Sequence, residues 1–453
     1  MKKTYKHSLS TAQIIMLSFL LVILIGSLLL WLPISSASGQ SVPYIDALFT
    51  ATTSTCVTGL VTLPTFSTWS VFGQAVILIL IQTGGLGVIT VISGFILTIR
   101  RKMGLGERLL IQDAFNLNTL SGLTSFVKRV IIGSFVVEGI GALLYMTVFV
   151  PDYGARGIWI SIFNSVSAFC NAGIDIFAAD SLCSYATNPV INIVTGLLII
   201  LGGIGYIVWW DLARIMPELK RKGLKCLRSL TLHSKIAIWT TLILILGGAV
   251  LIFAFEYNNP ATIGNMSLFD KIQVSLFQSV TTRTAGFASV PQENLTNASS
   301  ILCVLLMFIG GSPVGTAGGI KTVTVALLFA SAFSAVRGKD EVTLFNRNIS
   351  TEALKKAVAV LCSSFAILMV STLALSACTD ASALDVLYET ASATATVGLT
   401  RGITPALNAA GKLIVTATMY LGRVGPISLA FALNVKKKSQ NIIKNPTEDI
   451  SVG

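Results

Sequence analysis

The sequence has few charged residues and almost no histidine. Charged side chains make up 11% of its 453 residues, whereas a soluble domain usually carries about 25%. This shortage excludes an ordinary water-soluble globular protein. The two histidines, His7 and His233, lie in polar stretches, and the sequence has no His-Glu-x-x-His motif that would bind a catalytic zinc. We therefore expect that the protein is not an enzyme and has no catalytic residues.

Motifs for nucleotides and for thiolate-bound metals are also missing. The chain has no P-loop and no Gly-x-Gly-x-x-Gly fingerprint on a soluble βαβ unit, so any nucleotide sensing should reside in another protein. Its seven cysteines include no Cys-x-x-Cys pair, and most lie in apolar runs, where cysteine acts as a small hydrophobic residue. We expect no cofactor, no cysteine metal site and no obligatory disulfide.

Long apolar runs are abundant instead. Hydrophobic residues make up 53% of the chain, and the mean hydropathy is +0.79. Several runs reach the roughly 20 residues that span a bilayer, namely Ile14–Pro33, Ile191–Trp210, Ile236–Phe255 and Ala357–Ala377. The first run follows a basic start, but it is long for a signal peptide and has no evident cleavage site. We interpret it as a retained transmembrane helix.

The positive charges are confined to a few places. The net charge is +12, and most of the 32 Lys and Arg residues lie in residues 1–8, 100–129, 214–235, 337–356 and after Asn434. These stretches alternate with pairs of apolar segments, so all can lie on the cytoplasmic side under the positive-inside rule. They therefore indicate membrane topology rather than nucleic-acid binding. We predict a multi-pass plasma-membrane protein with both termini in the cytoplasm.

Four segments of the chain share one plan: an apolar helix, a short loop, a semi-polar segment rich in Ser and Thr, one glycine, and a second apolar helix. The shared glycines, Gly59, Gly173, Gly286 and Gly398, are 112 to 114 residues apart. The semi-polar segments are too short to span a bilayer and too apolar for ordinary loops, which favours short helices that enter the membrane and return. Ten residues before each glycine stands a large apolar side chain, at Phe49, Phe163, Leu276 and Tyr388.

These repeats predict an all-α polytopic membrane protein with eight transmembrane helices. Four parallel pore-loop repeats (helix M1, pore segment P, helix M2) would surround one pseudo-fourfold ion pore, which is unlike an inverted-repeat transporter. We expect the repeats at residues 11–99, 130–213, 236–336 and 357–434. Cytoplasmic linkers are expected at residues 100–129, 214–235 and 337–356, after an N-terminal segment at 1–10 and before a tail at 435–453.

The segment before each shared glycine has the properties of an ion filter. Rings of backbone carbonyls can replace the hydration shell of K⁺, and glycine adopts the required dihedral angles at the least cost. Val57, Asn171, Thr284 and Thr396 occupy one level but share no side-chain chemistry, which favours backbone ligands. We predict that K⁺ binds the carbonyls of Thr55, Cys56, Val57, Thr58, Gly59, Phe169, Cys170, Asn171, Ala172, Gly173, Thr282, Arg283, Thr284, Ala285, Gly286, Thr394, Ala395, Thr396, Val397 and Gly398.

Three cations, Arg283, Lys321 and Arg423, fall in segments expected at membrane depth, where an ionisable side chain is a functional candidate. We expect the Arg283 side chain to point away from the axis and to brace the third short helix. Lys321 belongs to residues 310–322, which contain five glycines and a proline and therefore should interrupt the second helix of repeat three. In repeats one and two the corresponding Gly84–Gly87 and Gly202–Gly205 indicate close helix packing.

Together these features resemble the Trk/Ktr/HKT superfamily of potassium transport proteins over about residues 11–434. Trk-type subunits carry two extra N-terminal helices, so the Ktr branch, with KtrB-like or KtrD-like subunits, is the more similar one. The resemblance implies that the interruption is an intramembrane gating loop, near an arginine that the family carries at the position of Arg423. The implied gate comprises Gly310, Gly311, Ser312, Pro313, Gly315, Thr316, Ala317, Gly318, Gly319, Lys321 and Arg423.

The resemblance also implies partners and a transport mode. It implies a homodimer with one pore per subunit and a cytosolic KtrA-like or KtrC-like nucleotide-binding regulatory ring. Potassium would enter through a gated pore driven by the membrane potential, with sodium as a candidate co-ion or activator. The alternative is a sodium- or ammonium-permeable channel of the same fold, because backbone ligands leave ion selectivity to the fine geometry of the site.

Overall fold

Helices account for almost all of the regular structure in the computed structural model, which describes residues 10–100, 104–114, 122–178, 180–339 and 341–425. Within these ranges the strands are β1 (Thr343–Leu344) and β2 (Arg347–Asn348), which form a small antiparallel hairpin. The predicted helical fold class is thereby confirmed. The tail expected at residues 435–453 and residues 1–9 of the N-terminal segment lie outside the described ranges.

The helices follow one order four times along the chain, and we call each set of a long, a short and a second apolar helix a quarter. The first two quarters contain α1 (Thr11–Trp31), α2 (Tyr44–Cys56), α4 (Val71–Leu86), α7 (Leu123–Tyr153), α8 (Arg156–Cys170) and α9 (Pro189–Gly203). The last two contain α11 (Leu232–Glu256), α12 (Leu268–Thr281), α13 (Asn297–Phe308), α15 (Thr351–Ser376), α16 (Ala383–Ala395) and α17 (Ala409–Val424).

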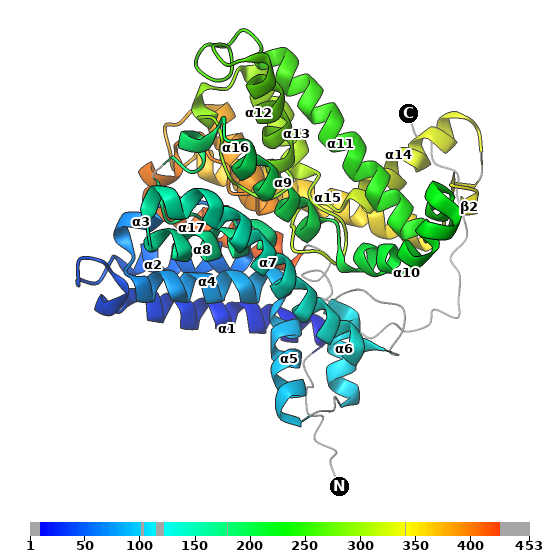
Figure 1. Cartoon of the computed structure of the whole chain (residues 1–453), viewed down its shortest axis with the longest axis horizontal. Helices are drawn as coiled ribbons and strands as arrows, with labels where there is room; N and C mark the ends of the chain where they lie inside the picture. Colours follow the sequence, from blue (N-terminus) through cyan, green and yellow to red (C-terminus); the bar gives the residue numbers. More distant parts are fainter. Residues whose placement is uncertain (1–9, 101–103, 115–121, 179, 340, 426–453) are drawn as a thin grey trace.

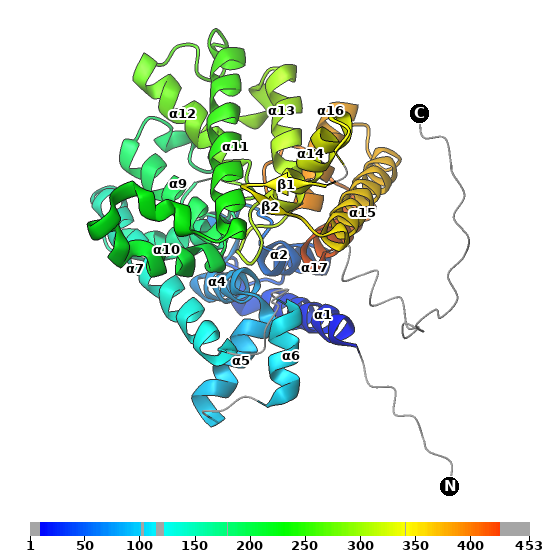
Figure 2. The ribbon, with the colours of Figure 1, turned by 90° about the vertical axis from the view of Figure 1, so that its right-hand side faces the viewer.

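Shorter elements complete the described chain. The remaining α-helices are α3 (Thr65–Thr68), α5 (Val88–Arg100), α6 (Leu105–Ala114), α10 (Tyr206–Lys222) and α14 (Thr322–Val336). The 3-10 turns are η1 (Pro33–Ser35), η2 (Cys183–Tyr185), η3 (Gly223–Ser229), η4 (Gln292–Asn294) and η5 (Thr404–Ala406). Helices α5 and α6 project from the main helical body at the bottom of both ribbon views (Figures 1 and 2).

Four described helices, α1, α7, α11 and α15, are long and apolar enough to cross a membrane on their own, and the total is six if each of two bent pairs counts as one span. The pairs are α4 with α5, bent by 95°, and α9 with α10, bent by 99°. The run Ile191–Trp210, which is long enough for one span, is therefore bent near Gly205, whose φ is +94°. The second helix of quarter three is divided between α13 and α14.

The four quarters pack into a closed ring. Each short helix packs against the long helix that precedes it, as α2 does on α1 and α8 does on α7. The second helix of each quarter also packs against the short helix of the next, in the pairs α4 with α8, α9 with α12, α13 with α16, and α17 with α2. Because the last pair joins quarter four to quarter one, the four short helices surround a common centre.

Two of the four short helices begin at a capping serine. Ser267 and Ser382 cap α12 and α16 by accepting hydrogen bonds from the backbone N–H groups of Asp270 and Asp385. Large apolar side chains then hold the helices in the core. Phe49, Phe163 and Tyr388 are fully buried, but the expected fourth member, Leu276, is 40% exposed and Phe277 is buried in its place.

Candidate functional site

Gly59, Gly173, Gly286 and Gly398 form a closed ring of backbone contacts. All four have positive φ angles, between +63° and +101°, which side chains other than that of glycine rarely tolerate. A Cβ atom built on any of them would lie closer than 3.0 Å to a carbonyl oxygen of the next quarter. These oxygens belong in turn to Ala172, Ala285, Val397 and Thr58, each the residue just before a ring glycine. The four glycines therefore surround one narrow axis, and any side chain would crowd it.

The residue two positions before each ring glycine has the same unusual backbone. Val57, Asn171, Thr284 and Thr396 all have φ between +53° and +66°, and all are buried. This left-handed residue ends the short helix in quarters one, two and four. The expected filter strands are consequently shorter than predicted, because in these three quarters their first two residues still belong to the helix. No helix-breaking residue precedes the left-handed turn.

Glycines of the second helices allow these helix ends to approach closely. A Cβ atom on Gly84, Gly202 or Gly422 would overlap the carbonyl oxygen of Thr55, Phe169 or Thr394, respectively. Each of these carbonyls belongs to the short helix of the same quarter. The glycine clusters thus serve close packing, as the sequence indicated, and their partner is a backbone carbonyl at the base of the expected filter.

Residues 309–321 form a non-helical loop that lies against three of the four helix ends. The Thr316 hydroxyl is 3.1 Å from the carbonyl oxygen of Phe169 in quarter two, and the N–H of Gly318 donates to the Thr284 hydroxyl in quarter three at 3.2 Å. A Cβ atom on Gly318 would meet Thr396 of quarter four. The loop, expected as a gate, therefore lies beside the helix ends that precede the ring glycines in the last three quarters.

The same loop closes the break between α9 and α10. The last carbonyls of α9 have no hydrogen-bond donor within the helix, and N–H groups of the loop donate to them instead. The N–H of Ser312 donates to the Gly203 carbonyl at 2.8 Å, and that of Thr316 donates to the Gly202 carbonyl at 3.1 Å. In return the N–H of Tyr206 donates to the Val314 carbonyl at 2.9 Å. The bend in quarter two and the loop of quarter three therefore form one unit.

Arg423 connects this loop to quarter one. Its Nη1 donates to the carbonyl of Thr316 at 2.6 Å, and its Nη2 donates to the carbonyl of Gly84 at the end of α4. Lys321 donates from Nζ to the Ala317 carbonyl within the loop at 2.6 Å. Both cations line a cavity of about 340 Å³ on the side of the loop where α5 begins. Two of the three cations predicted at membrane depth, Lys321 and Arg423, thus donate to carbonyls of the loop.

Arg283 is turned away from its own filter strand. Its side chain is 6% exposed, and Nη2 lies 3.3 Å from the Thr241 hydroxyl of α11 and 3.4 Å from the Gly310 carbonyl. The side chain therefore links the end of α12 to α11 and to the start of the loop. The Arg283 carbonyl accepts a hydrogen bond from Nδ2 of Asn171 at 3.3 Å, which joins the strands of quarters two and three.

Several filter hydroxyls have no hydrogen-bond partner among the described residues. They belong to Thr55, Thr58, Thr394 and Thr396, and each oxygen is fully buried. Thr55 and Thr394 stand at the same repeat position, four residues before a ring glycine. Buried hydroxyls are normally satisfied, so these oxygens are available to an ion or to water, beyond the backbone carbonyls that the sequence favoured.

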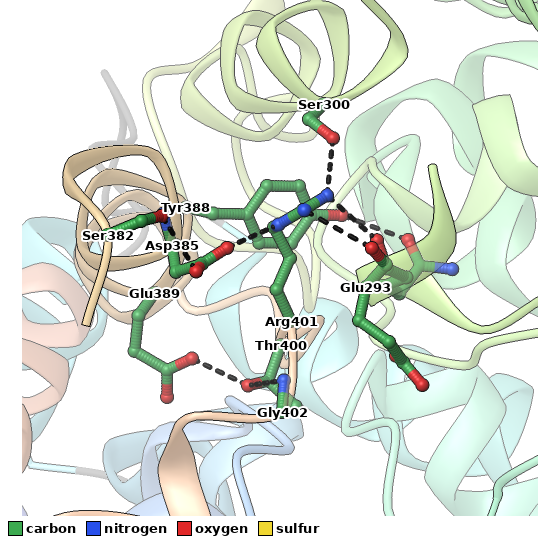
Figure 3. A network of polar contacts seen from close by, with 10 residues as sticks. Glu293, Ser300, Ser382, Asp385, Tyr388, Glu389, Thr400, Arg401 and Gly402 are labelled. Carbon is green, nitrogen blue, oxygen red and sulfur yellow. Dashed lines mark hydrogen bonds and ion pairs between the residues drawn. The ribbon is translucent and has the colours of Figure 1, made fainter. Parts of the chain in front are cut away.

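Two ion pairs that the sequence did not predict hold quarter four. Lys412 of α17 pairs with Asp46 of α2 at 2.6 Å, across the boundary between quarters four and one. Arg401 pairs with Asp385 at 2.6 Å, in the network drawn in Figure 3. Asp46 and Asp385 share one repeat position, thirteen residues before Gly59 and Gly398, and that shared position was the available signal.

The other boundaries are joined by neutral donors or by a single carboxyl group. Between quarters one and two, Nε1 of Trp159 donates to Gln74 at 2.9 Å, and Nε2 of Gln82 lies 2.9 Å from a carboxyl oxygen of Glu138. Between quarters two and three, the N–H of Leu182 donates to the Ala288 carbonyl at 2.9 Å. The ring is therefore not equivalent at its four boundaries.

One acidic side chain follows the ring in quarter two. Asp175 stands two residues after Gly173, outside the long helices. Burial, with a smaller contribution from the nearby carboxylate of Asp180, raises its pKa to about 7 against the hydrogen bond from Ser181. Because this carboxyl group titrates near neutral pH, its charge can vary under ordinary conditions.

Comparisons with known proteins agree with this geometry. A family model described as TrkH, cation transport protein, matches residues 2–445. The chain is 39% identical over 442 residues to the Ktr system potassium uptake protein B of Bacillus subtilis, a match that covers 97% of this chain and 96% of the relative. It is 38% identical over 459 residues to the potassium/sodium uptake protein NtpJ of Enterococcus hirae, covering 100% of this chain and 99% of the relative.

A solved structure has the same fold. The potassium transporter TrkH from Vibrio parahaemolyticus superposes with a TM-score of 0.75, covering 96% of this chain and 86% of that one. The two sequences are 16% identical, so this likeness concerns the arrangement of helices.

Proposed function

This chain belongs to the TrkH family of cation transport proteins, as its repeats suggested, and we propose that it takes up potassium across the plasma membrane through one gated pore. The family transports cations, which confirms the expectation that the protein is not an enzyme. Relatives that match almost the whole chain are named as potassium uptake proteins.

The ring of four glycines is the observation that carries this proposal. A left-handed residue and, two positions later, a glycine with positive φ recur in every quarter, and a carbonyl oxygen of the next quarter lies against each glycine. Carbonyl oxygens around a narrow axis can replace the water around a K⁺ ion. The four pore-loop repeats and the filter residues remain a proposal that rests on this geometry.

The membrane potential would drive the ion inward. An inside-negative potential supplies about 2.3 kcal/mol per charge for each 100 mV, so no chemical step is required. Control would lie at the loop of residues 309–321, because it lies beside three of the four helix ends and contains glycines that move at low cost. Arg423 would hold the loop in its closed position and repel cations by its charge.

Assembly follows the same proposal. We expect a homodimer with one pore per subunit, cytoplasmic termini, and a cytosolic nucleotide-binding ring of the KtrA or KtrC kind. The relative from Bacillus subtilis is named as part of a Ktr system, which supports a partner subunit. Copurification of the full chain with such a soluble subunit would test this part.

Growth rescue tests the transport function directly. A bacterial strain that lacks its own potassium uptake, and that expresses this chain with a regulatory ring, should grow at low potassium. Uptake of K⁺ and Rb⁺ should exceed uptake of Na⁺ in the same cells. A failure of rescue with the protein present in the membrane would contradict the proposal.

Sodium permeation is the second candidate. One relative is named a potassium/sodium uptake protein, and a backbone filter selects between these ions only through its geometry. Comparable uptake of Na⁺ and K⁺ in the rescue strain would favour this reading over a potassium-selective pore.

A further inference from the structure

Arg401 lies in the loop that follows the ring glycine of quarter four. Its side chain is 12% exposed, and all three guanidinium nitrogens have partners. Nε pairs with Asp385 at 2.6 Å, Nη1 donates to the Gln292 carbonyl at 3.0 Å and to the Ser300 hydroxyl at 2.6 Å, and Nη2 donates to the Glu293 carbonyl at 3.2 Å. Figure 3 shows Arg401 between Asp385, Ser300 and Glu293.

These partners come from two quarters. Asp385 stands in the first turn of α16, in quarter four, where it also accepts a hydrogen bond from Ser382 at 2.7 Å. Ser300 belongs to α13, and the two carbonyls belong to η4, all in quarter three. The Arg401 guanidinium therefore spans the boundary between quarters three and four, and Asp385 orients it from the side of quarter four.

A second contact crosses the same boundary. The Tyr388 hydroxyl of α16 donates to Oε1 of Gln292 at 2.9 Å, and that oxygen also accepts from Nε2 of Gln278 on α12 at 2.6 Å. Tyr388 and Gln278 are almost completely buried. The short helices of both quarters are thus joined through Gln292, whose backbone carbonyl also accepts a hydrogen bond from Arg401.

The network is tied to the ring by a short length of chain. Gly398 and Arg401 are three residues apart, so at most about 11 Å of extended chain separates them. Thr400 immediately precedes Arg401 in this stretch. Its hydroxyl donates a hydrogen bond to the Glu389 carboxyl group at 2.7 Å. Glu389 is fully buried and also accepts from Thr404. The loop therefore has little freedom to absorb a shift at Arg401 before it reaches Gly398.

We propose that Arg401 is a positioning residue that fixes the spacing of the filter strands of quarters three and four, and thereby sets the discrimination between K⁺ and Na⁺. This inference rests on the potassium pore proposed above. It assigns to Arg401 no contact with the ion. The planar guanidinium matches carbonyl, hydroxyl and carboxylate acceptors at once, which a lysine ammonium on a flexible stem does not.

Electrostatics favour this role over simple repulsion at the pore mouth. Burial alone would raise the pKa of Asp385, but the hydrogen bonds from Arg401 and Ser382 and the charge of Arg401 hold the pKa below its usual value. The acid is therefore ionised at neutral pH and compensates the Arg401 charge. An unpaired cation beside the entrance would instead weaken K⁺ entry by its charge.

Uptake measurements with Arg401→Gln, Arg401→Lys and Asp385→Asn test the proposal. In the rescue strain, Arg401→Gln should lower the ratio of K⁺ to Na⁺ uptake efficiency by roughly tenfold, the typical effect of losing charge-assisted hydrogen bonds. The maximal rate should change less than the KM for K⁺. Arg401→Lys should restore selectivity only in part, and Asp385→Asn should reduce it in the same direction. Lys356→Gln, which removes an exposed pair with Glu352, should have no effect.

Binding to the purified full chain supplies a second measurement. Potassium should raise the melting temperature of the wild-type protein more than sodium does, and this difference should shrink in Arg401→Gln. Unchanged selectivity in Arg401→Gln, full rescue by lysine, or a lower KM for K⁺ would each overturn the positioning role. If the wild-type protein itself takes up no potassium, the proposed function fails first and this inference falls with it.

Discussion

Replacement of Arg423 by alanine tests whether the loop of residues 309–321 is held closed. The guanidinium donates to the Thr316 carbonyl in the loop at 2.6 Å and to the Gly84 carbonyl of α4. Arg423→Ala removes both donors and one positive charge beside the cavity. The loop keeps its bonds to the end of α9, so we expect it to be loosened rather than unfolded.

The size of the effect follows from the bonds that differ between the closed and open loop. A hydrogen bond to a charged group contributes about 1.5–3 kcal/mol. Only the bond to Thr316 must break when the loop moves away from α17, since Gly84 belongs to α4 and not to the loop. One such bond corresponds to a shift of roughly 10- to 150-fold in the ratio of open to closed loop. Loss of the repelling charge acts in the same direction.

The assay is the initial rate of Rb⁺ uptake in cells that lack other potassium uptake systems. We expect the maximal rate in Arg423→Ala to rise roughly tenfold or more, as far as opening limits the flux. Arg423→Lys keeps the charge but loses the two-pronged donation, so it should give an intermediate rate. Arg337→Ala is the matched control, because this arginine lies over the Phe333 ring on α14 and does not touch the loop.

Two results would refute this reasoning. A rate and KM equal to those of the wild-type protein would mean that Arg423 neither holds the loop nor repels the ion. A lower rate in Arg423→Ala than in Arg423→Lys, at equal amounts in the membrane, would mean that the arginine supports conduction. Shortening the loop itself should still raise the flux if the loop is the barrier.

Three further predictions concern other parts of the ring. Gly286→Ala should abolish K⁺ selectivity, because its Cβ would crowd the Val397 carbonyl, whereas Gly39→Ala, at a glycine that also has a positive φ but nothing within 4 Å, should retain it; equal losses would contradict the crowding argument. The KM for K⁺ should fall by up to about fivefold between pH 6 and 8, because Asp175, whose pKa is raised to about 7, loses its proton and then attracts cations. Asp175→Asn should remove this pH dependence of KM. A pH dependence that is unchanged in Asp175→Asn would exclude Asp175 as its source. Lys412→Met should lower the free energy of unfolding by about 3 kcal/mol, because Asp46 stays buried without its partner; thermal unfolding should show recovery in the double variant with Asp46→Leu, and a fully stable single variant would contradict a structural role.

The ring glycines could be located from the sequence because glycine answers a local demand. Gly59 and Gly398 have positive φ angles, and a neighbouring carbonyl lies too close to leave room for a side chain. Only glycine meets both conditions. The spacing of 112 to 114 residues then revealed the four equivalent positions. The same reasoning found the glycines of the second helices but missed their partner, since nothing local to Gly84 indicates that the Thr55 carbonyl lies against it.

The bends and boundary contacts required long-range information. The apolar run Ile191–Trp210 gave no reason to break, because its break is completed by N–H groups of a loop more than a hundred residues further along the chain. Lys412 and Asp46 are 366 residues apart, and no local pattern connects them. At Leu276 the repeat pattern predicted the wrong buried residue, because α12 reaches its glycine by a different turn. In this turn the N–H of Ala285 donates to the carbonyl of Thr281, whereas in the other quarters the acceptor stands one position earlier.

Departures from fourfold symmetry lie where control of a pore would act. Quarters one and two use neutral donors or a lone carboxyl group at their shared boundary, whereas quarter four is held by Lys412 on one side and Arg401 on the other. Quarter three contributes the loop, and Arg423 of quarter four reaches across to hold it. The fourth quarter therefore carries cations that contact both quarter three beside its own ring glycine and the loop of residues 309–321. A change that moves this quarter relative to the others would alter selectivity and opening together, because the same helices, α16 and α17, position both.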